Sequence, residues 1–278
     1  MLTVTRGLDA RALDAIRALE IEVVDHDGGR LKLELGVLES RDPDLAQDAQ
    51  WWDGDRLLGF AGLYAFGPPN VEIAGMVAPD ARREGIGTAL LDALLPIAKG
   101  RDYAKALLVT PSTTPAGRDF AASRQATLDH SEHFLVLGET PPGLPLDPDV
   151  TIRSATRADL EVVRDLLRSA FGWEPPTDLL DRSGDATQVI ELRGMPVGTL
   201  RLSRHEDWGG VYGFAVGPAH QGRGIGRDVL GRVCRQLRDA GCTRVTLEVE
   251  TTNDNALRLY TSTGFVREAG EDYWALPV

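Results

Sequence analysis

The chain has 278 residues, of which 42% are hydrophobic and 26% charged, and its formal net charge is −12. These values fit a folded protein of one large or two ordinary domains, and the acidity disfavours nucleic acid, because phosphate binding needs a basic surface. No apolar run is long enough to span a bilayer and no secretory signal follows Met1, so we expect a cytoplasmic protein that binds no membrane.

In the N-terminal half, a strand-like apolar run leads into a glycine loop. Residues 75–88 read Gly-Met-Val-Ala-Pro-Asp-Ala-Arg-Arg-Glu-Gly-Ile-Gly-Thr and open an amphipathic helix. Glycines between a strand and a helix leave backbone N–H groups bare, and the helix N-terminus adds a positive partial charge. The loop is therefore predicted to cradle an anion such as a pyrophosphate.

A proline-rich linker is predicted at residues 139–149. Residues 138–149 hold four prolines and two glycines, which cannot sustain a helix or a central strand. We therefore predict one domain over residues 1–138 and a second over residues 150–278.

The second half shows an alternation of helical and strand patterns. Strands are predicted at 150–153, 187–192, 197–203, 211–216, 245–249 and 273–276, and helices at 157–171, 177–182, 225–240 and 255–261. A second glycine loop, residues 214–227, lies between the fourth strand and the third helix. The two cysteines, Cys234 and Cys242, have no metal-ligand spacing, so we expect reduced core thiols and no metal. Helices that alternate with a mixed sheet predict an α/β or α+β fold.

The two halves align without a gap at an offset of 139 residues, from about residue 51 to residue 137. The run Gly85-Ile86-Gly87, for example, falls on Gly224-Ile225-Gly226. A whole strand, loop and helix in one register indicates an internal duplication.

Other glycine-loop proteins fit less well. A dinucleotide-binding fingerprint needs a third glycine where Arg227 stands, and no Gly-Lys-Ser/Thr is present for a P-loop. A glycine-rich turn without a ligand remains the alternative, more so for the first copy than for the second.

The element order and two motifs resemble the GNAT N-acetyltransferase superfamily. Its acetyl-CoA loop has the form Gln/Arg-x-x-Gly-x-Gly/Ala, which Gln221, Gly224 and Gly226 match in the second copy. The first copy matches it with Arg82, Gly85 and Gly87, and a second family block runs from Asn253 to Phe265. The resemblance implies two tandem GNAT domains, each a mixed, splayed sheet flanked by helices. Tandem members of this size include the mycothiol synthases, whose active half is the C-terminal one.

The resemblance also implies which residues bind acetyl-CoA as co-substrate. Backbone N–H groups of the loop would hold the pyrophosphate, the N–H of Val216 would bind the acetyl carbonyl, and the side chain of Asn253 would contact the pantetheine. In the second copy the expected binding residues are Val216, Gln221, Gly222, Arg223, Gly224, Ile225, Gly226, Arg227 and Asn253. In the first copy they are Val77, Arg82, Arg83, Gly85, Gly87 and Thr88.

Two residues of the second copy are candidate catalysts. Tyr260 is the candidate general acid, since a phenol with a pKa of about 10 can protonate a departing thiolate; the alternative is a core tyrosine with a satisfied hydroxyl. Glu248 is the candidate base, because the same spacing to the tyrosine carries the base in ribosomal-protein N-terminal acetyltransferases of the family. The alternative is a surface carboxylate, and Glu250, Tyr212 and a water chain are held in reserve.

The first copy lacks these groups. At the offset of 139 residues, Tyr260 falls on Ala121, Glu248 on Val109 and Asn253 on Thr114. Alanine cannot transfer a proton, so the first domain is expected to be catalytically silent, whether or not it binds acetyl-CoA. Glu72, on the strand before the loop, is a possible base that weakens this expectation.

The sequence thus predicts an N-acetyltransferase that transfers an acetyl group by direct attack of a primary amine, on a small molecule or a peptide N-terminus. The alternatives are transfer of a longer acyl group and a non-catalytic acetyl-CoA sensor or scaffold. The acceptor would be held by residues 171–184 and 203–210, whose acidic and aromatic side chains (Trp173, Glu174, His205, Glu206, Asp207 and Trp208) suit a cation or are ordinary solvated loops. We expect a monomer, a pseudo-dimer of its domains, or a homodimer.

Overall fold

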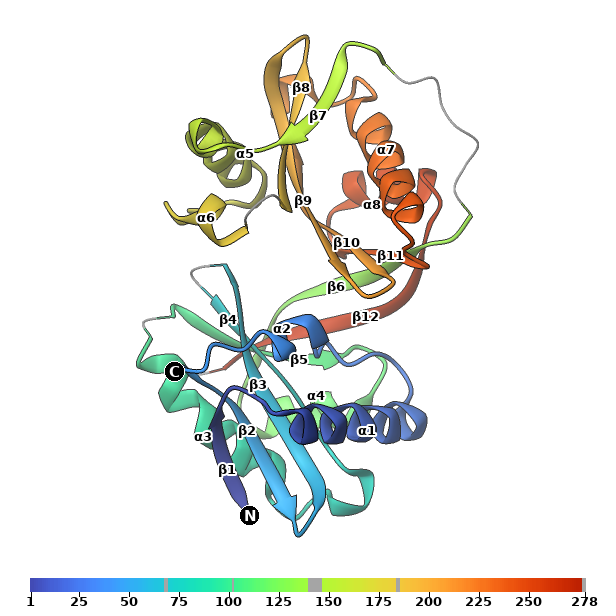
Figure 1. Ribbon diagram of the computed structural model, residues 1–278. Coiled ribbons are helices and arrows are strands. Elements are labelled where there is room, and N and C mark those ends of the chain that lie inside the picture. Colours follow the sequence, from blue (N-terminus) through green and yellow to red (C-terminus); the bar gives the residue numbers. More distant parts are fainter. Residues whose placement is uncertain (68–69, 102, 140–146, 184–185, 277–278) are drawn as a thin grey trace. The chain divides into compact units, whose positions relative to one another are not determined.

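The structure is a computed structural model that describes residues 1–278 except 68–69, 102, 140–146, 184–185 and 277–278 (Figure 1). The chain forms two compact units: an N-terminal unit of Met1–Ser131 and Ala269–Val278, and a C-terminal unit of Glu132–Glu268. Each unit is a mixed sheet with helices on its faces, as the sequence predicted. Most of the predicted linker, residues 140–146, lies outside the described residues.

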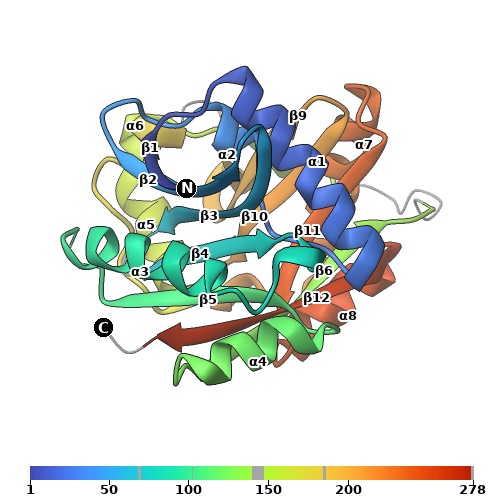
Figure 2. The same ribbon diagram turned by 90° about the horizontal axis from the view of Figure 1, so that it is seen from below.

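The N-terminal unit has its strands in the order β1-β2-β3-β4-β5-β12, which Figure 2 shows side by side. Its strands are β1 (Leu2–Arg6), β2 (Ala46–Asp53), β3 (Arg56–Gly67), β4 (Asn70–Val77), β5 (Lys105–Pro111), the start of β6 (Thr127–Leu137) and the end of β12 (Phe265–Leu276). Its helices are α1 (Ala10–Asp27), α2 (Leu35–Glu39), the 3-10 turn η1 (Pro79–Ala81), α3 (Ile86–Lys99) and α4 (Pro115–Ser123).

The C-terminal unit repeats this arrangement in the order β7-β8-β9-β10-β11-β6. Its strands are β7 (Val150–Ser154), β8 (Thr187–Leu192), β9 (Met195–His205), β10 (Trp208–Val216), β11 (Arg244–Glu250), the end of β6 and the start of β12. Its helical elements are η2 (Arg157–Asp159), α5 (Leu160–Phe171), α6 (Leu179–Ser183), η4 (Pro218–His220), α7 (Ile225–Asp239) and α8 (Asp254–Ser262). The predicted elements of this half are all present, and the largest difference is the last strand, which begins at Phe265 instead of 273.

The duplication is confirmed by the element bounds. Strands β5 and β11 and helices α4 and α8 begin and end 139 residues apart, the offset that the sequence alignment indicates. Ala121 and Tyr260 consequently occupy the same position in their helices, and both are buried. At this position the halves therefore differ by a side chain on the same scaffold.

Each sheet is splayed beside its glycine loop. In the N-terminal unit, the parallel pairing of β4 with β5 ends at Ile73 and Leu108, although β4 continues to Val77. In the C-terminal unit, β10 pairs with β11 only from Trp208 to Gly210 and continues to Val216. A bulge in β10 between Tyr212 and Ala215, with Gly213 at φ +54°, turns the strand at the start of this opening.

The two units exchange their last strands. In the C-terminal unit, β11 pairs with the end of β6, Leu247 opposite Leu135, and in the N-terminal unit, β5 pairs with the end of β12, Val109 opposite Tyr273. The predicted domains, residues 1–138 and 150–278, each include the last strand of their own half. In the compact units, each of these strands belongs mainly to the other unit. Strand periodicity tells which side chains share a face but not which neighbour a strand joins, so the sequence pattern did not indicate the exchange.

Cys234 and Cys242 are buried free thiols, and burial raises the pKa of Cys234 to about 12. Among the described helices, none has the length and apolar character needed to cross a membrane. In the same described residues, no group of three or more His, Cys, Asp and Glu side chains is placed to hold a metal ion.

Candidate active site

The second glycine loop forms the cradle that its sequence predicts. Gly222 and Gly224 have φ values of +73° and +84°, and Gly224 is the residue that precedes the first turn of α7. Left-handed residues that alternate with ordinary ones point successive backbone N–H groups into one concavity, and the N–H groups of the first turn have no acceptor within the helix. Ile225, Gly226 and Arg227 therefore present donors suited to a pyrophosphate.

The N–H of Val216 points into the splay. Gly217 donates its N–H to the carbonyl of Val197 on β9, at 2.8 Å. Antiparallel pairs alternate between hydrogen-bonded and open kinds, so the neighbouring pair of Val216 and Gly198 is open. The N–H and C=O of Val216 then face away from β9, toward the side where β11 has diverged. A thioester carbonyl placed there would find the donor that the sequence predicted.

Gln221 ties the loop to the strand end. Its side-chain Nε2 donates to the carbonyl of Val216 at 2.8 Å, so it positions the backbone on either side of the cradle. In the first copy, Arg82 does the same through Nε, at 3.1 Å from the carbonyl of Val77. Arg82 also forms an ion pair with Asp27 at 2.7 Å, and this hydrogen-bonded guanidinium lowers the pKa of Asp27. The first residue of the motif thus acts as a strut in both copies.

Removing this strut is expected to weaken acetyl-CoA binding modestly. Gln221→Ala deletes one hydrogen bond of about 0.5–1.5 kcal/mol, which corresponds to about a 2- to 10-fold rise in Kd. Calorimetric titration with acetyl-CoA measures it. Gln236→Ala, on α7 beyond the first turns, is the matched control, and an equal loss in both variants would mean that the strut has no part in binding.

The first cradle keeps the same backbone shape. Arg83 has φ +66° and Gly85 has φ +85°, so Arg83 holds the conformation that Gly222 holds in the second copy. A non-glycine residue in the left-handed region is strained, and such strain persists where the surroundings impose it. Gly87 and Thr88 follow in the first turn of α3, as predicted.

Tyr260 lies on α8 with its ring packed edge-on against Phe265, at 6.2 Å between centroids. The side chain is 8% exposed, and burial raises its pKa to about 12. Its hydroxyl makes no hydrogen bond with any residue in the described part of the chain. This differs from a core tyrosine with a satisfied hydroxyl, and a protonated donor without a protein partner is suited to a ligand atom.

Glu248 lies at the point where β11 leaves β10. Its neighbours Leu247 and Val249 belong to the core formed with α7, so the half-buried Glu248 points to the opposite face of the sheet. Glu250 shares this face but is exposed at the strand end, beside Thr252 at 3.4 Å. Of the two carboxylates, Glu248 is nearer the start of the splay.

Asn253 caps α8. Its side-chain oxygen accepts the N–H of Ala256 at 3.1 Å, which leaves the side-chain amide nitrogen as its donor toward a ligand. In the first copy, Thr114 precedes α4 without a side-chain cap and donates to the carbonyl of Pro111 instead. Asn253, the predicted pantetheine contact, thus also caps α8, the helix that carries Tyr260.

In the N-terminal unit, the carboxylate of Glu72 is paired with a buried lysine. Nζ of Lys32 lies 3.2 Å from the Glu72 carboxylate and donates to the hydroxyl of Tyr273 at 2.6 Å. Lys32 is 7% exposed. An internal ammonium therefore pairs with the carboxylate that the sequence offered as a possible base. This ion pair was not predictable from the sequence pattern, since Lys32 lies far from both partners along the chain.

The loops expected to hold a cationic acceptor are largely engaged with arginines. The Glu174 carboxylate accepts from Arg164 and Arg168, and Arg244 lies over the ring of Trp208 at 4.6 Å. Asp207 accepts from the hydroxyl of Thr243. These contacts favour the alternative of ordinary surface loops over a cation site.

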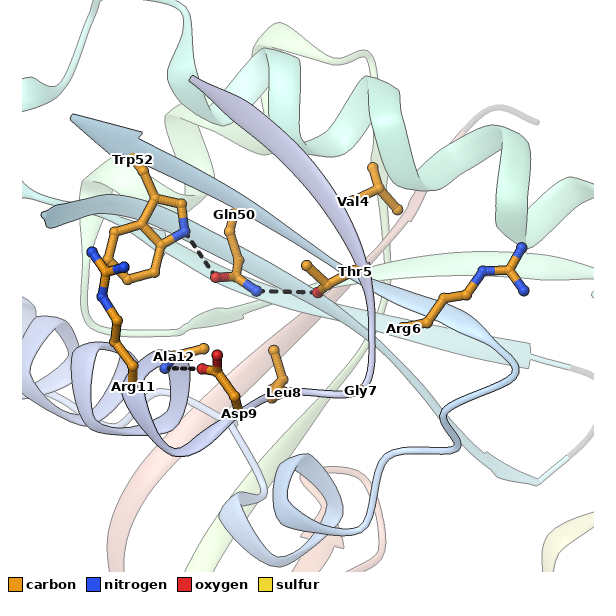
Figure 3. A pocket seen from close by; sticks show the side chains of 10 residues that line it. All are labelled: Val4, Thr5, Arg6, Gly7, Leu8, Asp9, Arg11, Ala12, Gln50 and Trp52. Carbon is orange, nitrogen blue, oxygen red and sulfur yellow. Dashed lines mark hydrogen bonds between the residues drawn. The ribbon is translucent and has the colours of Figure 1, made fainter. Parts of the chain in front are cut away.

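A separate cavity of about 800 Å³ lies at the start of α1 in the N-terminal unit. Figure 3 shows its wall, where Gln50 links the hydroxyl of Thr5 to the indole N–H of Trp52, and Asp9 caps the helix. None of the predicted site residues lines it. The cavity is thus distinct from both glycine loops.

Comparisons with known proteins agree with this geometry. The model of the acetyltransferase (GNAT) family matches residues 15–123 and 160–265, one match in each half. Two relatives named mycothiol acetyltransferase are similar over most of their length. The protein from Catenulispora acidiphila is 31% identical over 87% of this chain and 87% of its own, and that from Acidothermus cellulolyticus is 30% identical over 94% and 89%.

Solved structures show the same fold at low identity. A GCN5-related N-acetyltransferase from Sphaerobacter thermophilus superposes with a TM-score of 0.81 at 17% identity, covering 99% of this chain and 96% of that one. A tandem GNAT protein from the clavulanic acid biosynthesis pathway has a TM-score of 0.69 at 16% identity, covering 99% and 97%. With a family match in each half and a glycine cradle in each unit, the chain is a tandem member of the GNAT acetyltransferase family.

Proposed function

We propose that the C-terminal unit transfers an acetyl group from acetyl-CoA to a primary amine of a small molecule or a peptide N-terminus, and that the N-terminal unit is catalytically silent. The observation that supports it most is that the C-terminal unit has, beside its glycine cradle, the buried, protonated Tyr260 on α8, whose hydroxyl bonds no described residue, whereas the N-terminal unit has Ala121 at that position. Family membership supplies the acetyl transfer, and the assignment of roles to residues is our proposal.

The proposed reaction has three protein contributions. Glu248 accepts a proton from the acceptor ammonium, and the neutral nitrogen attacks the thioester carbonyl. The N–H of Val216 donates to the oxygen on which negative charge develops. As the C–S bond breaks, Tyr260 gives its proton to the sulfur, so the products are an amide and the free thiol of CoA. The attacking nitrogen loses its second proton as the amide forms, and this proton restores the tyrosinate through solvent, while Glu248 releases its own proton to solvent.

The silence of the N-terminal unit rests on two observations. Ala121 stands where Tyr260 stands in the C-terminal unit, so the proposed acid has no counterpart at that position. Lys32 holds the carboxylate of Glu72 in an ion pair, so that carboxylate is engaged. The strained backbone at Arg83 keeps the cradle shape, and we therefore propose that the N-terminal unit binds acetyl-CoA without turning it over.

The first test is release of free thiol from acetyl-CoA by the full chain with a panel of primary amines. The panel contains amino acids, amino sugars, polyamines, dipeptides and the deacetylated form of mycothiol, the compound for which the relatives are named. Transfer to at least one amine is expected. Acetyl-CoA binding without transfer to any of them would favour the sensor or scaffold, and faster transfer from a longer acyl-CoA would favour the other enzyme alternative.

Two buried free thiols are consistent with the cytoplasmic location that the sequence predicts.

Glu248→Gln is expected to lower kcat/KM for the acceptor by about 10²- to 10⁴-fold at neutral pH, because the amine then loses its proton only to water. The loss should shrink as the pH approaches the pKa of the acceptor amine, where more of the amine is already neutral. Rates measured from pH 7 to 10 check this. Glu250→Gln, two residues along the same strand face, is the matched control, and an equal loss there would remove Glu248 from the role.

A further inference from the structure

An arginine and a tyrosine form a pair on the sheet of the C-terminal unit that the proposed mechanism does not use. Arg201 of β9 and Tyr212 of β10 are direct cross-strand partners, so their side chains share one face. The guanidinium carbon of Arg201 lies 5.0 Å from the centroid of the Tyr212 ring. The ring therefore supports the cation in a defined position.

A glycine provides the space in which this ring lies. A Cβ built on Gly210 would come within 2.3 Å of the Tyr212 ring and 2.6 Å of its hydroxyl oxygen. Tyr212 is thus folded back along its own strand into the volume that a side chain at position 210 would fill. No other residue type leaves that volume open, so Gly210 fixes where Tyr212, and with it Arg201, can lie.

The pair occupies the same face of the sheet as Glu248. Gly209 and Val211 face α7, since a Cβ on Gly209 would meet Leu237 at 3.0 Å and Val211 belongs to the core with that helix. Tyr212 therefore points away from α7, as Glu248 does. Gly210 is the last residue of β10 that pairs with β11, opposite Thr246, so Tyr212 and Glu248 each lie two residues beyond it, at the opening of the splay.

Arg201 has an uncompensated charge. Its guanidinium forms no ion pair or hydrogen bond with any residue that the structure describes. Its contact is the cation–π contact with the ring of Tyr212. Arg153 and Arg232 of the same unit differ in this respect, because Arg153 pairs with Asp159 at 2.8 Å and Arg232 with Asp228 at 2.7 Å. In a chain of net charge −12, a guanidinium held by an aromatic ring and left without a carboxylate is placed for an anion from outside the chain.

We propose that Arg201, supported by Tyr212 above Gly210, binds an anionic group of the acceptor, a carboxylate or a phosphate, while Glu248 receives the acceptor's amine. This rests on the proposed function of the C-terminal unit. Strands β9 and β11 lie on either side of β10, so the backbones that carry Arg201 and Glu248 are separated by two strand spacings, about 10 Å. Both residues lie on the same face of the sheet, which matches a small zwitterion that carries its amine and its anion a few bonds apart.

The test compares acceptors that differ only in the anionic group. Alanine is paired with alaninamide for the carboxylate, and glucosamine 6-phosphate with glucosamine for the phosphate, each measured as kcat/KM with saturating acetyl-CoA. The native protein is expected to prefer the anionic member of at least one pair by about 10-fold or more, since hydrogen bonds to charged groups are the strong ones. Which pair shows the preference distinguishes carboxylate from phosphate.

Arg201→Gln is expected to reduce that preference to about 1- to 2-fold, while kcat/KM for the neutral member and the Kd of acetyl-CoA stay unchanged. Arg204→Gln, on the same strand with its side chain on the other face, should keep the full preference. Gly210→Ala keeps the guanidinium of Arg201 in the protein but displaces the ring that supports it, and an intermediate loss is expected.

A preference unchanged in Arg201→Gln, or no preference in the native protein while it acetylates the neutral amines, would overturn this inference and leave the proposed function intact. A native protein that binds acetyl-CoA and acetylates none of these amines, nor any in the wider panel, would overturn both.

Discussion

Tyr260→Phe is expected to lower kcat by about 10²- to 10⁴-fold and to leave the Kd of acetyl-CoA within about 2-fold of the native value. The substitution removes the hydroxyl alone. The ring contact with Phe265 and the packing of α8 remain, and no hydrogen bond to a described residue is lost. A loss of turnover would therefore report the missing proton donor and not a disturbed fold.

The raised pKa of Tyr260 decides its role. Burial destabilises the phenolate and raises the pKa from the ordinary 10.0 to about 12, so the group keeps its proton throughout the neutral and mildly alkaline range. Tyr260 can thus act as an acid but not as a base near neutral pH. Since its proton is lost only as the pH rises through about 12, kcat should show no alkaline decline caused by this residue below pH 10.

The control for this variant is Tyr64→Phe in the N-terminal unit. Tyr64 is 1% exposed and its hydroxyl has no hydrogen-bond partner among the described residues, so the same atom is removed from an equally buried ring outside the site. Turnover should be unchanged there. Full activity of Tyr260→Phe would remove the acid from the mechanism, and residual activity above that of the amine alone would measure what the remaining groups contribute.

Gly226→Glu is expected to raise the Kd of acetyl-CoA at the second cradle by 100-fold or more. The new carboxylate would stand in the first turn of α7, where the loop and the helix otherwise present only N–H groups to a pyrophosphate. Its Cβ would come within 3.2 Å of Leu259 and 3.8 Å of Phe214, contacts that those flexible side chains can relax. A negative charge also suits a helix N-terminus, so the fold should tolerate the substitution even though acetyl-CoA binding is lost.

Calorimetric stoichiometry makes this prediction informative about both units. If the first cradle also binds acetyl-CoA, the native protein takes up two equivalents, and Gly226→Glu and the matching Gly87→Glu each retain one. Gly87→Glu should leave turnover unchanged, because that unit is proposed to be silent. The control is Gly231→Glu, further along α7, where a Cβ comes no closer than 3.8 Å to its neighbours. Undisturbed binding in Gly226→Glu would place the pyrophosphate elsewhere.

The sequence predicted the parts of this protein that depend on local pattern. The glycine loops, the helices they open and the offset of 139 residues all appear in the structure, because turn chemistry and side-chain periodicity are set by neighbouring residues. The contacts that give residues their roles were not predictable in this way. Arg82 matched the family motif, but its ion pair with Asp27 joins residues 55 positions apart.

The same limit applies to the acceptor side. Tyr212 was held in reserve as a base, whereas the structure shows its ring lying over Gly210 and beneath Arg201, an arrangement that two strands create together. Lys32 meets Glu72 and Tyr273 only because three distant segments converge in the N-terminal unit. A single sequence contains the residues of such clusters without any periodic signal of their meeting.

Because the last strands are exchanged, neither sequence half contains all the strands of one compact unit. A fragment that ends at residue 138 carries away Glu132–Leu137, which belongs to the other sheet, and leaves β5 as an open edge without Ala269–Leu276. Open edges recruit other strands, so either half made alone should aggregate or pair with a second copy of itself. Two fragments made together should instead reassemble and regain activity although the covalent link is cut. An ancestral single half, by the same reasoning, would have completed its sheet only by trading strands with a twin.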